Sequence, residues 1–510
     1  MKKTRLTALF FVAALLAALF AGCAAGEPAA TTEASTTSTA ATTAAVSTAA
    51  ASTTATSAAT AATTATTTTA APATTVATTA PYRSLQAASM PTDSAYHAEI
   101  DWPYGLNTAM SVRNMVSTDI GYYMVLTNFL FYMDADAMEP VPVCAKPNCL
   151  HYNEEEIERI NACNAFMNVE GMQASLSCYD DKLWFIGQVE TINDPEHPFQ
   201  FAVQSMEPDG SSRKVVYRFD PECGVDYGVL HRGVFYVVLT SFDEEVRSKA
   251  TLMACSLSDP RQAPECILEL ECFGGDGGFI GLTAYGDRLY FYRYISDDGD
   301  REFCSFDLET GELTAFPIVD ELYLPLNVAT FIGDKIYLTC RTEVPQGDPK
   351  DENSYPERLY RCDLDGSDLE LLFDGWGDYV SDQQYLYRVP NYVSIGPDDH
   401  TVNIYDADGQ EVDSVDLAAL ANPGDIWEAG VMVPPVDQTI LWFESFGENG
   451  VRMYLYWFDK AEIGSGEIVV HPICNYSMTA NSSTPGSEVF DFDTAGMLEM
   501  AAAAVANKAE

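Results

Sequence analysis

The sequence predicts an all-β fold, a seven-bladed β-propeller of four-stranded antiparallel blades. A pattern typical of a β-hairpin returns about every fifty residues between positions 100 and 475. A second hairpin follows the first in several of these units, and four strands at this period are typical of propeller blades. Long amphipathic helical patterns are missing from this region, which argues against an α/β fold.

The clearest copy of the hairpin is Phe279–Tyr294. An apolar run leads to a Gly286-Asp287 turn, and a second run alternates aromatic with charged residues. Similar pairs lie at Gln173–Gly187, Val225–Leu239 and Asn327–Thr339, with weaker copies at Ser111–Leu126, Tyr379–Val389 and Val431–Phe443. Second hairpins are predicted to turn at Thr310-Gly311, Asp365-Gly366 and Asp408-Gly409. Seven such units fill the region.

Residues 1–22 are predicted to be a lipoprotein signal peptide. Basic residues precede the apolar segment Leu6–Gly22, and the segment ends directly before Cys23. This end resembles the bacterial lipoprotein box, although Phe20 stands where Leu is usual, and it implies that Cys23 carries lipid. The chain is then expected on the cell membrane, facing the extracellular side, with the membrane as a partner. The alternative is an ordinary signal peptide with an incidental cysteine.

Three further parts follow along the chain. Residues 23–81 are the lipidated cysteine and a Thr/Ala/Ser-rich linker in which only Glu27 and Glu33 are charged, so we expect a disordered tether. Residues 82–475 form the predicted propeller domain. Residues 476–510 are a polar tail, in which Thr494–Lys508 is either an Ala-rich helix or a frayed end.

The charge balance excludes one class of partner. The chain has 75 acidic against 27 basic residues, a formal net charge of −48. Nucleic acid binding needs clustered cations on phosphates, so no nucleic acid partner is expected. An excess of carboxylates favours solubility and a monomer, and fits either cation binding or a solvated surface.

The densest cluster of reactive side chains is Cys144, Cys149, His151 and Cys163, with the spacing C-x4-C-x-H-x11-C. A Pro-Asn turn between the first two thiols can gather three ligands, and Cys163 completes a tetrahedral Cys₃His set suited to structural zinc. A disulfide from Cys144 or Cys149 to Cys163, or unlinked apolar thiols, are the alternatives. Zinc or a disulfide would staple the connection between blades 1 and 2.

Other cysteines are interpreted by position. Cys255 and Cys362 align with apolar third-strand positions and are predicted to be core. Cys266 and Cys272 are close enough in sequence to pair, although their connectivity cannot be derived.

The candidate ligand-binding face consists of long acidic loops between the second and third strands. Asp297, Asp298 and Asp300 lie in one such loop, and Trp376 and Trp427 are placed in blade-to-blade connections on the same face. Carboxylates beside exposed tryptophan would suit a carbohydrate, a cationic peptide or Ca²⁺. The alternative is that these loops are only a solvated surface.

One hairpin carries a family resemblance. Leu359–Ser367 (LYRCDLDGS) is similar to the recurring hairpin of TolB-like and related propellers, and the chain resembles exported propeller lipoproteins of Gram-positive anaerobes, a group without an established activity. Similar Cys-Pro-x-Cys-x-His segments followed by Cys-x-Ala occur there, and Cys163-Asn164-Ala165 fits that ending.

The sequence thus predicts a membrane-anchored extracellular propeller that binds or scaffolds a glycan, peptide or protein ligand. No G-x-S-x-G, H-E-x-x-H or phosphate-loop motif is present, so no catalytic residue is assigned. The alternative is an extracellular carbohydrate-active enzyme, a glycoside hydrolase or lyase, that uses paired carboxylates. Structural zinc is the only cofactor expected.

Overall fold

A computed structural model describes residues 91, 95 and 97 and most of the region between 115 and 478. The residues not described within that region are 119–120, 127, 152–156, 168–174, 192–193, 195–196, 243–247, 273–278, 297–300, 317–321, 324–328, 343–356, 375–377, 383, 390–399, 421–425, 433–436 and 448–449. In the described part, no helix is long and apolar enough to cross a membrane.

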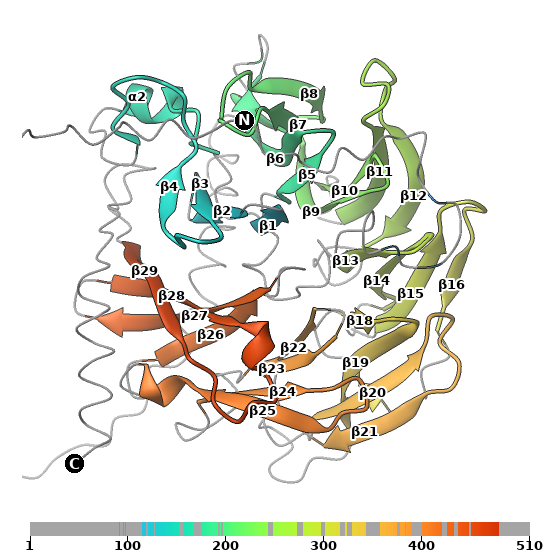
Figure 1. Cartoon of the computed structure of the whole chain (residues 1–510). Coiled ribbons are helices and arrows are strands. Elements are labelled where there is room, and N and C mark those ends of the chain that lie inside the picture. The colour runs from blue at the N-terminus through green and yellow to red at the C-terminus, as the bar shows by residue number, and fades with distance from the viewer. Residues whose placement is uncertain are drawn as a thin grey trace, which may run out of the picture. The chain divides into compact units, whose positions relative to one another are not determined.

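The described strands form seven antiparallel sheets arranged as blades around a common centre (Figure 1). Blade 1 contains β1 (Met115–Thr118), β2 (Gly121–Leu126), β3 (Phe129–Asp134) and β4 (Pro140–Pro142). Blade 2 contains β5 (Ser177–Tyr179), β6 (Lys182–Glu190), β7 (Phe199–Met206) and β8 (Lys214–Arg218). Blade 3 contains β9 (Cys223–His231), β10 (Val234–Phe242), β11 (Ser248–Ser256) and β12 (Glu265–Glu271).

The other four blades follow in chain order. Blade 4 contains β13 (Phe279–Tyr285), β14 (Arg288–Tyr294), β15 (Arg301–Asp307) and β16 (Leu313–Ala315). Blade 5 contains β17 (Leu322–Tyr323), β18 (Thr330–Ile332), β19 (Lys335–Thr342), β20 (Glu357–Asp363) and β21 (Glu370–Asp374). Blade 6 contains β22 (Asp378–Ser381), β23 (Leu386–Val389), β24 (Thr401–Tyr405) and β25 (Glu411–Asp416). Blade 7 contains β26 (Ile426–Met432), β27 (Gln438–Gly447), β28 (Gly450–Asp459) and β29 (His471–Met478).

The helices among the described residues are short. They are α2 (Ile157–Ala162), between blades 1 and 2, and the 3₁₀ turns η5 (Leu417–Ala419) and η7 (Lys460–Glu462). Asp416 and Asp459 cap η5 and η7, because each carboxylate accepts a hydrogen bond from a backbone N–H two residues on.

The predicted seven-bladed propeller is confirmed, with two differences in detail. The first strand of blade 5 is split, since both β17 and β18 pair with β19. The last strand ends at Met478, three residues past the predicted boundary at 475. The second hairpins turn at the glycines where the sequence predicted a turn. At Gly366 the φ of 83° favours glycine. An added Cβ at Gly366 would also lie 2.9 Å from the Phe316 ring of blade 4.

The core is divided into seven apolar clusters, one for each interface between neighbouring blades. Strand β14 shows why the strands are apolar on both faces. Leu289 and Phe291 are buried against blade 3, whereas Tyr290 and Tyr292 are buried against blade 5. Side chains alternate between the two faces of a strand, so each blade must supply apolar side chains to two interfaces.

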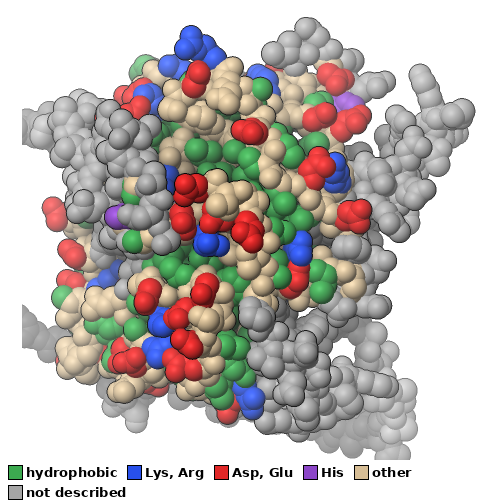
Figure 2. Space-filling view, turned by 90° about the vertical axis from the view of Figure 1, so that its right-hand side faces the viewer, with side chains coloured by type: hydrophobic (Ala, Val, Ile, Leu, Met, Phe, Trp, Pro, Cys, Tyr) green, Lys and Arg blue, Asp and Glu red, His purple; other side chains and the backbone are tan. Residues whose placement is uncertain are grey.

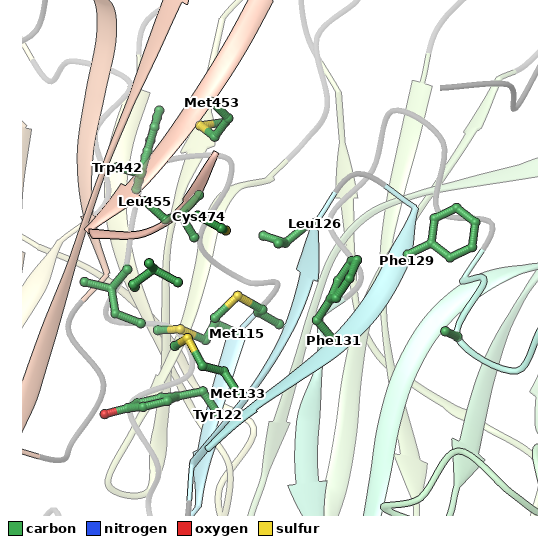
Figure 3. Packing of buried hydrophobic residues seen from close by; sticks show 14 of the residues in the cluster. Met115, Tyr122, Leu126, Phe129, Phe131, Met133, Trp442, Met453, Leu455 and Cys474 are labelled. Atoms are coloured by element: carbon green, nitrogen blue, oxygen red, sulfur yellow. The ribbon is translucent and has the colours of Figure 1, made fainter. Parts of the chain in front are cut away.

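The interface between blades 1 and 7 closes the ring, and we call it the closing seam. Among the described residues, blade 1 takes all its strands from the N-terminal end and blade 7 all its strands from the C-terminal end. Figure 3 shows Met115, Met133 and Tyr122 of blade 1 in one cluster with Trp442 and Leu455 of blade 7. The seam is therefore held by side chains, and the Tyr122 hydroxyl also donates a hydrogen bond to Oε1 of Gln438.

The structure shows where the cysteines outside the predicted metal site lie. Cys255 and Cys362 are buried, as predicted. Cys266 and Cys272, whose connectivity the sequence left open, are both free: Cys266 lies on β12, and Cys272 follows the end of the same strand. A strand advances about 3.3 Å per residue, which places the two residues about 20 Å apart, beyond the ~7 Å limit between Cα atoms of a disulfide.

The outer face that carries β12 and β16 shows acidic and basic side chains beside one another (Figure 2). Lys249 pairs with Glu269 at 2.7 Å across β11 and β12, and Arg358 pairs with Asp374 at 2.7 Å across β20 and β21. Exposed pairs of this kind contribute about 0–1 kcal/mol each. This face is therefore a mixed solvated surface rather than a uniformly acidic one.

Candidate metal centre

Two short segments bring the predicted ligands together. The first leaves β4, where the Val143 N–H still bonds the Leu130 carbonyl at 2.9 Å, and continues into Cys144. The chain then reverses at Pro147-Asn148, where Asn148 adopts a φ of 61°, a conformation that Asn tolerates better than most residues. This reversal returns the chain so that Cys149 and His151 lie beside Cys144.

The second segment begins with α2. Cys163 follows this helix directly, and its N–H bonds the Ile160 carbonyl at 2.9 Å. The chain then pairs with the start of β3, because the Leu130 N–H donates to the Ala165 carbonyl and the Met167 N–H to the Asn128 carbonyl, both at 2.8 Å. We call residues 143–151 and 157–167 the cysteine loop.

The four predicted ligands converge. One ligand atom from each of Cys144, Cys149, His151 and Cys163 lies within 4.8 Å of the other three, and Cys163 Sγ is 3.5 Å from His151 Nδ1. Ligands at the corners of a tetrahedron with zinc bonds of about 2.3 Å are separated by about 3.8 Å. The observed spread is therefore within about 1 Å of that needed for a tetrahedral Cys₃His site.

Hydrogen bonds favour a charged sulfur at Cys144. Burial alone raises the pKa of this thiol, but hydrogen bonds lower the pKa overall. The donors are the backbone N–H groups of Lys146 and Asn164 and the thiols of Cys163 and Cys149. Backbone N–H groups directed at a sulfur stabilise the thiolate that a metal requires and fix the ligand's orientation.

Cys163 behaves differently. Burial raises the pKa of its thiol to about 12, and the Ala165 N–H only partly opposes this. Without a cation, Cys163 therefore stays protonated at neutral pH, whereas the hydrogen bonds at Cys144 lower the pKa of that thiol. A divalent metal would overcome this difference in pKa between the two thiols, because it coordinates thiolates and displaces their protons.

A cation from blade 2 completes the electrostatic surroundings. Arg213 follows the β7–β8 turn, and its guanidinium donates to the carbonyl oxygens of Phe166 and Met167, the latter at 3.5 Å, while its Nε donates to Gln204 at 2.9 Å. Burial lowers the pKa of Arg213 to about 10, and the nearby Cys163 opposes that shift. Arg213 thus remains charged at neutral pH, and its partners among the described residues include no carboxylate.

This charge matches one state of the centre. Three thiolates, a neutral imidazole and Zn²⁺ together carry one negative charge, which a single buried arginine would balance. A buried cation without an acidic partner is costly, so an anionic neighbour stabilises it. The donor set and its surroundings therefore fit zinc. Four protein ligands leave no open position, so such a site would be structural rather than catalytic.

The thiols carry no disulfide in this structure. All twelve described cysteines, the three of the centre included, are free. Cys163 is buried, and Cys144, Cys149 and His151 are half-buried.

The other predicted site residues are not brought together by described contacts. Cys23, Trp376, Asp297, Asp298 and Asp300 lie outside the described residues. The prediction for Trp427 needs correction: its backbone lies within β26, the innermost strand of blade 7, rather than in a connection. It stands at a register shift between Ile426 and Glu428, and such an irregularity hides the period-2 pattern that identifies a strand.

Two residues were not anticipated from the sequence. Arg213 lies about fifty residues after Cys163, and only the packing of blade 2 against the cysteine loop places it at the centre. Asp226 lies on β9, an innermost strand, where burial raises its pKa although the Thr240 hydroxyl bonds it. No local pattern marks either residue, because Arg213 depends on a contact between blade 2 and the cysteine loop, and Asp226 on burial beside the neighbouring strand β10.

Comparisons with known proteins add the following. No family model and no curated protein matches the chain. Among solved structures, the β-propeller domain of the Trilobed protease from Pyrococcus furiosus is similar at 14% identity and a TM-score of 0.37, over 59% of this chain and 82% of that one. TolB from Acinetobacter baumannii is similar at 12% identity and a TM-score of 0.34, over 70% and 78%.

A third similar structure is the acylaminoacyl peptidase of Pyrococcus horikoshii, at 16% identity and a TM-score of 0.34. That likeness covers 62% of this chain and 52% of that one, so this chain spans about half of the peptidase. At such identities and TM-scores the likenesses carry no argument about activity. The propeller fold rests on this chain's own seven sheets.

Proposed function

We propose that this chain is a membrane-anchored, extracellular β-propeller that binds or scaffolds a glycan, peptide or protein ligand, and that its cysteine loop holds one structural zinc ion. The observation that carries the zinc proposal is the convergence of four ligand atoms within 4.8 Å. The observation that supports a binding role is the rigid seven-bladed frame, because recognition is usually carried by loops that such a frame holds apart.

The zinc proposal is tested by elemental analysis of the purified full chain with free-thiol counting. We expect one zinc per chain, and all twelve thiols other than Cys23 recovered after denaturation in chelator. His151→Ala and Cys163→Ser should lose the zinc, since loss of a ligand weakens metal binding by at least about 10–100-fold. Cys255→Ser is the matched control, because it removes a buried thiol from the blade 2–blade 3 interface. A metal-free protein with a mapped disulfide to Cys163 would contradict the proposal.

The anchor is tested at Cys23. Metabolic labelling with a fatty acid should modify the wild-type chain, and Cys23→Ser should abolish the label and release the protein from the membrane fraction. A chain that stays soluble and unlabelled with Cys23 intact would contradict the anchor.

The binding role is tested by a screen of glycans, peptides and cell-wall fragments against the immobilised propeller. We expect one ligand class to bind in a saturable manner. Turnover of a polysaccharide, abolished by a single carboxylate substitution, would instead support the enzyme alternative. The described residues do not favour that alternative: Asp226 is one carboxylate with a raised pKa, and hydrolysis needs a pair.

A further inference from the structure

The ends of the ring meet without exchanging a strand. In the described chain, β1–β4 come from residues 115–142 and β26–β29 from residues 426–478, so no blade joins the two ends through backbone hydrogen bonds. All other interfaces lie between blades that follow one another in the chain. Among the described strands, the closing seam is therefore the one interface between blades that do not follow one another in the chain.

The cysteine loop packs into this seam. Ile160 of α2 and Cys163, Ala165 and Phe166 after it are buried in the same apolar cluster as Trp442 and Leu455 of blade 7. The half-buried Cys144 and Cys149 pack against that cluster, as does Trp457 on β28. The loop thus adds buried side chains from outside the blade 1 sheet to the apolar cluster that joins blades 1 and 7.

The positions of the ligands tie the ends of this insertion together. Three ligands precede α2 and the fourth follows it directly, while Lys146 Nζ donates to the Ala162 carbonyl across the same gap. The far end of the loop is fixed on β3 by the hydrogen bonds at Ala165 and Met167. Coordination of all four ligands would fix α2, and with it Ile160 and Phe166, against the seam.

We propose that the cysteine loop is the clasp of the propeller: with its metal bound, it holds blade 1 against blade 7 in place of a shared strand. This inference rests on the zinc site proposed above and adds its role. Removal of the metal then loosens the closing seam before it affects interfaces on the opposite side of the ring.

Amide hydrogen exchange of the full chain, with and without a zinc chelator, tests the clasp. After chelation we expect exchange at least about tenfold faster in β28–β29, which is equivalent to about 1.4 kcal/mol of lost protection. Peptides from β13–β15, which pack in interfaces away from the seam, should exchange at an unchanged rate. Metal content is measured on the same samples.

The outcomes separate the two proposals. Loss of metal with faster exchange confined to residues 143–151 and 157–167 would overturn the clasp and leave the zinc site standing. Equal acceleration in all blades would also overturn the clasp. A starting sample without metal would overturn the zinc site and the clasp together.

Variants guard against a general folding defect. His151→Ala should reproduce the chelated exchange pattern, and His151→Cys, which restores four ligands suited to zinc, should return β28–β29 to slow exchange. Cys255→Ser should leave the seam unchanged. Fast exchange at the seam in the zinc-loaded His151→Cys chain would count against the clasp.

Discussion

The closing seam and the interface between blades 4 and 5 solve the same packing problem in different ways. Five methionines contribute to the seam, namely Met115, Met124, Met133, Met138 and Met453. Among the described residues, the cluster between blades 4 and 5 contains no methionine and more aromatic rings than the seam: Tyr285 stacks on Phe331 with ring centroids 4.6 Å apart, and Phe303 meets Phe316 edge-on at 4.9 Å. Methionine adapts to irregular gaps, whereas paired rings fix one geometry.

The two interfaces also differ in chain connectivity. The hydrogen bond across the seam joins Tyr122 and Gln438, 316 residues apart, while the bond from Tyr285 to the Gly333 carbonyl spans 48 residues. For a flexible chain, closing the longer loop costs about 1.7 kcal/mol more. Forming the seam therefore costs more loop-closure free energy than forming the aromatic interface between blades 4 and 5. A clasp at the seam would offset this extra cost.

The largest expected effect on stability is that of a substitution in the aromatic interface between blades 4 and 5. Phe331 is fully buried, and its ring centroid lies 4.6 Å from that of Tyr285 and 4.9 Å from that of Tyr290. Phe331→Ala should therefore lower the free energy of unfolding by about 3–5 kcal/mol. Denaturant unfolding measures this change. The loss should be the same with and without chelator; a loss below about 1 kcal/mol would mean that the rings do not determine this interface.

The next largest effect on stability is expected from a substitution in the closing seam. Gly430 pairs with Trp442 across β26 and β27, and an added Cβ would lie 2.2 Å from the indole. Gly430→Ala must displace the indole from its packed position in the seam and should cost about 1–3 kcal/mol. Gly311→Ser is a matched glycine control, since its Cβ would meet nothing within 4 Å, although its φ of 72° adds local strain. A Gly430→Ala chain as stable as the wild type would show that the seam absorbs the displacement.

Alkaline pH compares the two interfaces through their tyrosines. Burial is the main cause that raises the pKa of Tyr290 and Tyr292 at the aromatic interface and of Tyr122 at the seam. Because the folded pKa is raised, this stability is complete below the unfolded pKa of about 10 and is lost as the pH rises toward the folded value.

Each of these tyrosines should contribute about 1.4 kcal/mol per pH unit to the decline of stability above about pH 10. Tyr122→Phe should therefore remove one such contribution, and the double variant Tyr290→Phe/Tyr292→Phe about two. Unfolding free energies between about pH 9 and 11.5 measure the slopes. Equal slopes in all chains would contradict the burial of these hydroxyls.

The smallest expected effect compares two tyrosine hydroxyls within the aromatic interface. The Tyr285 hydroxyl donates to the Gly333 carbonyl, whereas the buried Tyr292 hydroxyl has no hydrogen-bond partner among the described residues. Tyr285→Phe should cost about 1 kcal/mol, and Tyr292→Phe should be neutral or stabilising by about 1 kcal/mol. Thermal unfolding compares the two variants; a clear loss in Tyr292→Phe would show a partner for that hydroxyl.

Much of the frame could be predicted from local pattern. Turns such as Gly286-Asp287 and Asp365-Gly366 mark hairpins because glycine permits the required φ, and their period gives the number of blades. The ligands Cys144, Cys149, His151 and Cys163 were found for the same reason, since they lie within twenty residues of one another. Local chemistry is visible in a sequence.

Contacts between blades were not visible. Arg213 reaches the cysteine loop from another blade, and the seam joins residues more than 300 positions apart. The register shift in β26 breaks the alternation that would identify Trp427 as a strand residue. The short sequence separation of Cys266 and Cys272 does not reveal that an extended strand keeps them apart. These features depend on tertiary packing that no local pattern records.

X-ray absorption at the zinc edge tests the central claim, a Cys₃His zinc centre in the cysteine loop, most directly. The purified full chain should show a first shell of three sulfur atoms at about 2.3 Å and one nitrogen at about 2.0 Å. In His151→Cys the nitrogen should be replaced by a fourth sulfur. A chain without zinc, or a first shell dominated by oxygen and nitrogen, would contradict the claim.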